Sequence, residues 1–146
     1  MSGARPIHEV ALSPREALLF EAGIKLGGVF HQYLGIPVSR RTAPALARAI
    51  AAAVELQPFV RSARVRIDPS SGGPVGRGRF GYRYLTPEML DVTVELADGT
   101  TLVEARLRHR PDLRYPLMSV VRVKPAARRR PAERARRPAR AGLRTG

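Results

Sequence analysis

The chain has 146 residues, which suits one domain, and 44% of them are hydrophobic, with no Cys and no Trp. The lack of Cys excludes disulfides, thiolate metal sites and cysteine nucleophiles. The three His residues are too widely spaced for an HxH or HExxH motif, so no metal site is predicted. No apolar run approaches the roughly 20 residues that span a bilayer, and the N-terminus lacks a signal-peptide layout, so we expect a cytoplasmic protein without membrane contact.

The formal net charge of +14 is unevenly distributed along the chain. Residues 124–146 carry nine basic side chains and one acidic side chain, a net charge of +8, among Pro and Ala residues that can bury very little surface. We therefore expect residues 1–123 to form the folded domain and residues 124–146 to be a disordered basic tail.

Ser13 begins the first strong helix signal. Ser13 can cap the helix, Pro14 fits its first position, and Glu16 completes a capping box. The helix is expected over 16–33 and to end near Gly35 and Pro37. Glycines are unusually dense inside it, which predicts either close helix packing or the close approach of another backbone or a ligand. They are Gly23, Gly27 and Gly28.

A second, Ala-rich helix is predicted over 45–56, after a polar connection over 40–44. Beyond it the apolar residues alternate with polar ones, which predicts strands over 63–67, 89–96 and 100–107. Asp98 and Gly99 between the last two predict a tight hairpin. Shorter strands are expected over 80–85 and 117–123. The fold class is therefore α+β, with two N-terminal helices packed on a mostly antiparallel sheet of four or five strands.

Glu21 and Lys25 are the first candidate site residues. They are four residues apart and share a face of the predicted helix. An exposed pair of this kind would contribute only a few tenths of a kcal/mol. The surrounding Gly and aliphatic residues instead favour burial, which would make both groups usable for proton transfer.

His31 is ten residues beyond Glu21, so the two lie about 15 Å apart along a straight helix. Either they contact opposite ends of one ligand, or the site is built across a subunit boundary, and we favour the boundary. Gln57 at the second helix end can bind backbone or read the edge of a heterocycle. Tyr115 at the start of the last strand is either a core aromatic or a phenol that passes a proton.

Two further hypotheses, nucleotide binding and nucleic-acid binding, have weaker support in the sequence. The Gly-rich stretch 72–78 lacks the Lys-Ser/Thr of a P-loop and precedes no helix, so it is interpreted as a loop. The alternative function is a basic nucleic-acid-binding module, in which Phe80, Tyr82 and Tyr84 stack bases and the Arg-rich tail binds polyanions non-specifically.

Five segments in order resemble the archaeal-type dihydroneopterin aldolase family, and the resemblance spans most of 14–123. They are residues 21–38 (EAGIKLGGVFHQYLGIPV), 57–60 (QPFV), 82–84 (YRY), 89–94 (MLDVTV) and 115–118 (YPLM). The first segment is the most specific.

The resemblance implies a retro-aldol cleavage of dihydroneopterin to hydroxymethyl-dihydropterin and glycolaldehyde, on the route to methanopterin or folate-type carriers. It implies no cofactor, metal or Schiff base, and a homotetramer with its sites at subunit interfaces. The implied site has Glu21 and Gln57 on the pterin and His31 and Tyr115 as catalytic groups. Lys25 would be accessory.

Overall fold

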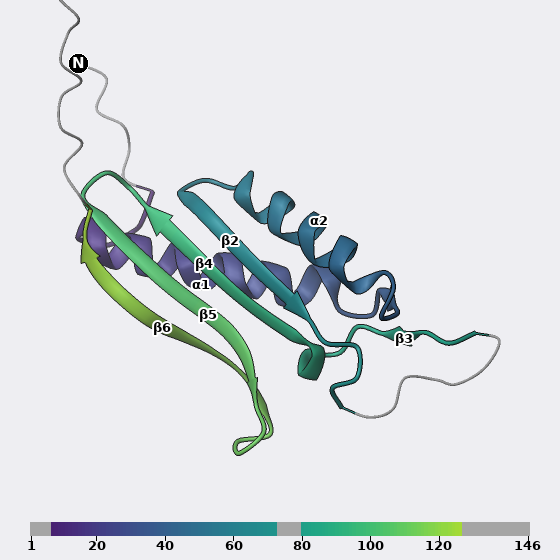
Figure 1. The fold of residues 1–146 in the computed structure, drawn as a ribbon. Helices are drawn as coiled ribbons and strands as arrows, with labels where there is room; N and C mark the ends of the chain where they lie inside the picture. Colours follow the sequence, from purple (N-terminus) through teal and green to yellow (C-terminus); the bar gives the residue numbers. More distant parts are fainter. Residues whose placement is uncertain (1–6, 73–79, 127–146) are drawn as a thin grey trace, which may run out of the picture.

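The structure, a computed structural model, describes residues 7–72 and 80–126. Its helices are α1 (Pro14–Tyr33), α2 (Ala43–Glu55) and the short 3₁₀ helix η1 (Pro87–Met89), and its strands are β1 (Pro37–Val38), β2 (Val60–Ile67), β3 (Arg83–Tyr84), β4 (Leu90–Ala97), β5 (Thr101–Arg110) and β6 (Tyr115–Pro125). An antiparallel sheet has the order β2-β4-β5-β6 (Figure 1). Strand β1 pairs with β3 in a separate two-stranded sheet. The predicted α+β class is confirmed.

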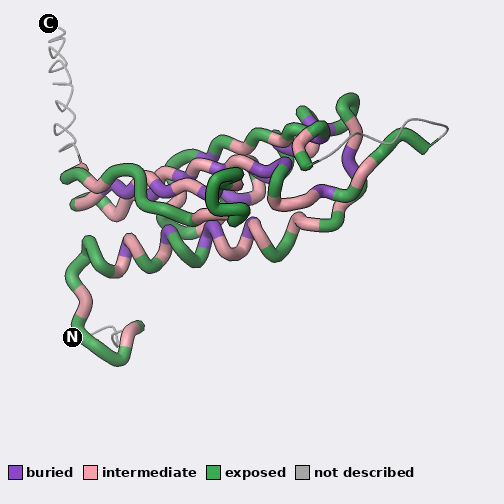
Figure 2. Tube along the Cα trace, turned by 90° about the horizontal axis from the view of Figure 1, so that it is seen from below, coloured by how far each residue is buried: buried purple, intermediate pink, exposed green. Residues whose placement is uncertain are grey.

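Both long helices cover the same face of the four-stranded sheet. Helix α1 packs on β4 and β5, and α2 packs on β2. Figure 2 shows α1 as a separate layer beside the sheet. Alternate positions of the strands fill the space between these layers, as expected for a sheet buried on one face. Fully buried members of this core include Leu26, Val29, Ile50, Val54, Val92, Val94, Leu96 and Val103.

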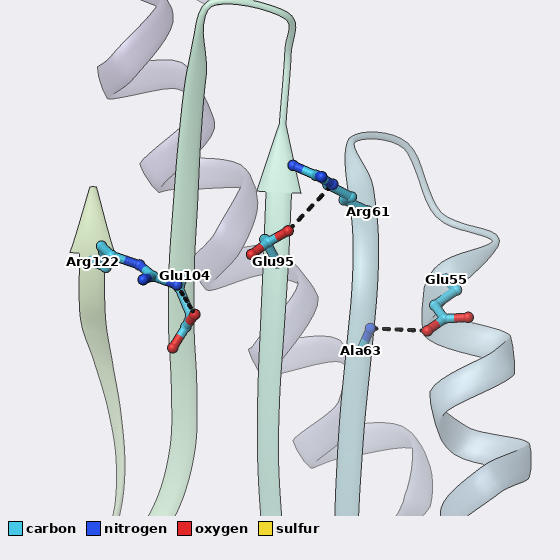
Figure 3. Close-up of polar contacts among 6 residues, drawn as sticks. All are labelled: Glu55, Arg61, Ala63, Glu95, Glu104 and Arg122. Atoms are coloured by element: carbon cyan, nitrogen blue, oxygen red, sulfur yellow. Dashed lines mark hydrogen bonds and ion pairs between the residues drawn. The ribbon is translucent and has the colours of Figure 1, made fainter. Parts of the chain in front are cut away.

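The opposite face of the sheet carries charged side chains. Arg61 pairs with Glu95 at 3.4 Å and Arg122 pairs with Glu104 at 2.8 Å (Figure 3). Such exposed pairs each contribute at most about 1 kcal/mol. This face therefore makes no second hydrophobic core, and the domain is a two-layer structure.

Helix α1 begins and ends where the sequence predicts. The Ser13 hydroxyl accepts the Glu16 N–H at 3.1 Å, and the Glu16 carboxylate accepts the Ser13 N–H at 3.2 Å. At the other end Gly35 has φ +89° and donates its N–H to the Leu85 carbonyl at 2.9 Å. The C-terminal end of α1 is thereby attached to the segment that contains β3.

The hairpin between β4 and β5 is also confirmed. Gly99 has φ +94°, and one carboxylate oxygen of Asp98 accepts the N–H groups of Thr100 and Thr101 at 2.9 and 2.8 Å. This tight turn sets the register in which Val94 pairs with Ala105. The apolar residues of both strands consequently face the helices.

Some boundaries differ from those predicted. Helix α2 begins two residues earlier, because Pro44 is accepted in its first turn. The aromatic strand expected over 80–85 is reduced to Arg83–Tyr84, since its partner β1 is only two residues long. Strand β6 continues to Pro125, into the range expected for the tail. Most of that tail (127–146) and most of the Gly-rich stretch lie outside the described residues.

Within the described residues, 7–72 and 80–126, no helix combines the length and apolar character needed to cross a membrane.

We predict that Ser13→Ala lowers the free energy of unfolding by about 1 kcal/mol, because the Glu16 N–H loses its acceptor at the helix start. Urea denaturation would measure the change. Ser62→Ala is the matched control, since Ser62 is exposed on the outer sheet face and should change stability little. Equal stability of the two variants would contradict a capping role for Ser13.

Candidate active site

An ion pair inside α1 defines the candidate site. The Lys25 ammonium donates to the Glu21 carboxylate at 2.7 Å. Lys25 is only 5% exposed and is the one buried charged residue among those described, whereas the Glu21 side chain is 25% exposed. An ammonium taken out of water requires a partner, so Lys25 holds the carboxylate of Glu21 at the surface of the core.

The Glu21 side chain lines a cavity of about 530 Å³ at the N-terminal end of α1. The size lies in the range of small-molecule sites. Its walls are mainly apolar: Ile7, Val10, Ala11, Leu12, Pro14, Ala17, Leu18 and Phe59. The polar lining residues are His8, Ser13, Glu21 and Asp98. Two cavities of similar volume lie elsewhere, but each is lined by four or five Arg, Asp and Glu side chains. The Glu21 cavity differs because it offers a few acceptors in an apolar setting.

Phe59 enters this cavity from the turn between α2 and β2. Its φ of +69° lies in the left-handed region, which costs a bulky residue about 1–3 kcal/mol. Phe59 is 47% exposed and is not packed into the core. Gln57 lies two residues earlier, just beyond the C-cap of α2, and is not among the residues that line the cavity.

Asp98, in the β4–β5 hairpin, also lines the cavity. Desolvation opposes ionisation of its carboxyl, but hydrogen bonds from Thr100 and Thr101 outweigh it and lower the pKa of Asp98 below its ordinary value. Asp98 is therefore a fixed negative charge at neutral pH. Sequence analysis found it only as a turn residue and missed its position at the site.

His31 and Tyr115 lie away from this cavity and are not among the residues that line it in the described chain. His31 is exposed in the last turns of α1, with its ring edge-to-face against Phe30 at 5.5 Å. Tyr115 is 59% exposed and pairs with Arg110 at the end of the sheet opposite the Asp98 hairpin. The nine residue steps along β5 correspond to roughly 30 Å, so Tyr115 and Glu21 do not meet within one chain.

The side of α1 that faces away from the sheet is also unusual. Residues spaced by three and four form one stripe there: Phe20, Gly23, Ile24, Gly27 and His31. Phe20 and Ile24 are 58% and 48% exposed. A Cβ added at Gly23, Gly27 or Gly28 would meet nothing within 4 Å. The close approach predicted from these glycines therefore does not occur within the described part of the chain.

The aromatic residues of the nucleic-acid hypothesis are exposed: Phe80, Tyr82 and Tyr84. Tyr82 and Tyr84 contact each other edge to face at 5.7 Å. Their exposure is compatible with base stacking, and that hypothesis stays a prediction. Across 7–72 and 80–126, no three His, Asp or Glu side chains are grouped so that they could hold a metal ion.

Comparison with known proteins identifies the family. Residues 13–121 match the dihydroneopterin aldolase family. A dihydroneopterin aldolase of Methanopyrus kandleri is 41% identical over 113 residues, which cover 77% of this chain and 92% of that protein. One from Picrophilus torridus is 36% identical over 99 residues, 68% of this chain and 80% of that protein.

A crystal structure of a Picrophilus torridus protein has the same fold, with a TM-score of 0.68 and 31% identity over 81% of this chain and 92% of that one. The α+β fold of this chain is thus shared with a solved relative. The chain belongs to the archaeal-type dihydroneopterin aldolase family, as its sequence motifs predict.

The Glu21–Lys25 pair yields a stability prediction. Glu21→Gln should lower the free energy of unfolding by roughly 1–3 kcal/mol, because the buried ammonium of Lys25 loses its counter-charge. Adding Lys25→Met should restore most of this loss, since no buried charge then remains. Denaturant unfolding of the two single variants and the double variant gives the coupling energy.

The matched control is Asp112→Asn, which breaks the exposed Arg110–Asp112 pair and should leave the free energy of unfolding almost unchanged. If the double variant were less stable than both single variants, the pair would not be the source of the effect.

Proposed function

We propose that the protein cleaves dihydroneopterin to hydroxymethyl-dihydropterin and glycolaldehyde, within the synthesis of methanopterin or folate-type carriers. The reaction is an acid/base retro-aldol without a metal or a Schiff base. The active unit is an oligomer, a tetramer by the family resemblance, with each site shared between subunits. The observation that carries the proposal is the Glu21 carboxylate, held by a buried lysine in an apolar cavity of a chain that belongs to this family.

The cavity suits a flat heterocycle with donors along one edge. Glu21 uses one carboxylate oxygen for Lys25, and its other oxygen accepts no hydrogen bond from the described residues. A carboxylate pairs well with the adjacent amino and N–H groups of a pterin ring. We assign Gln57, two residues before the cavity-lining Phe59, to the same polar edge of the ring. Ring binding therefore belongs to this part of the chain.

The substrate itself accepts the electrons of the reaction. A base removes the proton from the hydroxyl on the second side-chain carbon, and that C–O becomes the aldehyde C=O. The bond to the first side-chain carbon breaks, and its electron pair moves into the adjacent C=N bond of the ring. A proton delivered to the first carbon then completes hydroxymethyl-dihydropterin. The protein has to supply only binding and two proton transfers.

His31 takes the hydroxyl proton in this proposal, and Tyr115 delivers or relays the final proton. Lys25 orients Glu21. Both catalytic groups are exposed and distant from the cavity in their own chain, which supports their action on the substrate bound to a neighbouring copy. In the alternative noted from sequence, Glu21 and His31 of one chain contact opposite ends of one ligand, which would have to span the roughly 15 Å between them along α1.

The outer stripe of α1 supports an oligomer. It exposes Phe20 and Ile24 beside glycines that could accept a neighbouring backbone closely, and it contains His31. Exposed apolar side chains that adjoin one another are typical of protein interfaces. We expect light scattering to give a mass above that of a monomer.

We predict that the purified, chelator-treated protein forms both products from dihydroneopterin. His31→Ala should mainly lower kcat, by about 100-fold or more, because a proton-transfer group is lost. Glu21→Ala should mainly raise KM, because it removes the ring anchor. Steady-state kinetics with detection of glycolaldehyde would measure both. If both variants cleaved dihydroneopterin with wild-type kcat and KM, the proposed site would be wrong.

Mixing the two impaired variants, assayed at a substrate concentration far below the KM of Glu21→Ala, tests whether sites are shared. If Glu21 and His31 act across a two-fold boundary, co-expressed Glu21→Ala and His31→Ala chains regain intact sites, up to about a quarter of the total in a random mixture. If both residues act within one chain, no intact site can form. The control is a mixture of Glu21→Ala with Glu21→Gln, which lacks an intact Glu21 in every site. Activity no higher than this control would overturn the shared site.

A further inference from the structure

The turn between α2 and β2 contains a phenylalanine where glycine is expected. Val60 donates its N–H to the Gln57 carbonyl at 3.3 Å, Pro58 occupies the second position, and Phe59 at the third has φ +69°. These are the features of a type II turn, whose third position normally takes Gly or Asn because other side chains are strained there. The ring of Phe59 is therefore kept at a conformational cost.

The surrounding bonds prevent the turn from relaxing. The Phe59 carbonyl accepts the Ala97 N–H at 2.9 Å, which attaches the turn to β4. On the other side, the carboxylate of Glu55 in the last turn of α2 accepts the Ala63 N–H of β2 at 3.0 Å (Figure 3). A register irregularity between Val60 and Ser62 lies directly after the turn. Bulges of this kind often redirect side chains beside active sites.

Core packing does not account for the aromatic side chain. Phe59 is nearly half exposed and lies outside both clusters of buried apolar residues. Its ring instead lines the Glu21 cavity. Strain that persists at such a position, without compensation from the core, is typical of residues with a functional role.

We propose that the Phe59 ring is the stacking platform for the pterin ring, an inference that rests on the proposed function. Glu21 fixes the donor edge of a bound ring but leaves the ring free to tilt about that edge. An aromatic wall removes this freedom through offset stacking. Phe59 is thus a positioning residue. It selects planar fused heterocycles, whatever side chain they carry.

Removal of the Phe59 side chain should relieve backbone strain, which favours stability, but should weaken pterin binding. Measuring Tm and Kd on the same variant therefore separates the two effects. Phe59→Gly relieves the positive φ, so its Tm should rise or stay unchanged, while its Kd for oxidised pterin should rise about tenfold, as for the loss of one aromatic stack. Oxidised pterin has the ring and no side chain to cleave, and its own fluorescence reports binding. Phe59→Trp should keep the wild-type Kd, and Phe59→Leu should bind weakly although it retains the apolar volume.

The matched control is Phe80→Gly, the same change at an exposed phenylalanine outside the cavity, which should leave the Kd unchanged. A Phe59→Gly variant that binds pterin within twofold of wild type would overturn the platform. A fall in its Tm would also overturn it, because the ring would then be structural.

Cleavage of dihydroneopterin by the wild-type protein is measured in parallel. If the wild-type protein cleaves dihydroneopterin and Phe59→Gly binds pterin as tightly as wild type, the platform is overturned and the proposed function stays in place. Wild-type binding that depends on Phe59 without cleavage would overturn the function and support the platform. If the wild-type protein neither bound oxidised pterin nor cleaved dihydroneopterin, both proposals would be overturned.

Discussion

The arrangement of the site depends on one buried ammonium group. Lys25 lies among the aliphatic side chains that pack α1 on the sheet, where an unpaired charge would be strongly unfavourable. The carboxylate of Glu21, one helical turn earlier, is its partner. Because Lys25 is fixed by the core, the carboxylate is fixed as well, at the boundary between the core and an apolar cavity. Pairing of this kind gives a rigid acceptor without placing it on a flexible loop.

The remaining site residues follow from topology. Helix α1 is 20 residues long, so its two ends lie at different parts of the domain. The β4–β5 and β5–β6 hairpins lie at opposite ends of the sheet, separated by the length of β5. The Asp98 hairpin and the Phe59 turn meet the first half of α1, whereas His31 and Tyr115 belong to other surfaces. Distributing binding and proton transfer over different surfaces is consistent with completion of the site by assembly.

Local signals in the sequence predict much of the fold. The capping box at Ser13 and the Asp98-Gly99 hairpin act over three or four residues, so they could be identified without knowledge of the tertiary structure. The β1–β3 pair could not, because two-residue strands have no periodicity and depend on hydrogen bonds between distant segments. The short length of β3 could not be predicted either, because it is set by pairing with the two-residue strand β1.

The candidate site was predictable only in part. Glu21 and Lys25 follow from helical spacing, whereas the role of Gln57, which does not line the cavity, stays a prediction. Phe59 is different, because a positive φ at a phenylalanine contradicts its intrinsic preference and arises from the turn and the strand contacts together. The contribution of residues 7–12 to the cavity wall also required the tertiary structure, since that segment has no regular secondary structure.

The Glu55–Ala63 hydrogen bond has a consequence for solubility. Strand β2 is an edge of the four-stranded sheet, and unpaired amides on an edge strand are templates for addition of a foreign strand. The Ala63 amide is already occupied by a helix side chain, and Arg61 and Arg64 add positive charge beside it. This edge of the sheet is therefore protected against aggregation by the same contact that stabilises the turn next to the cavity.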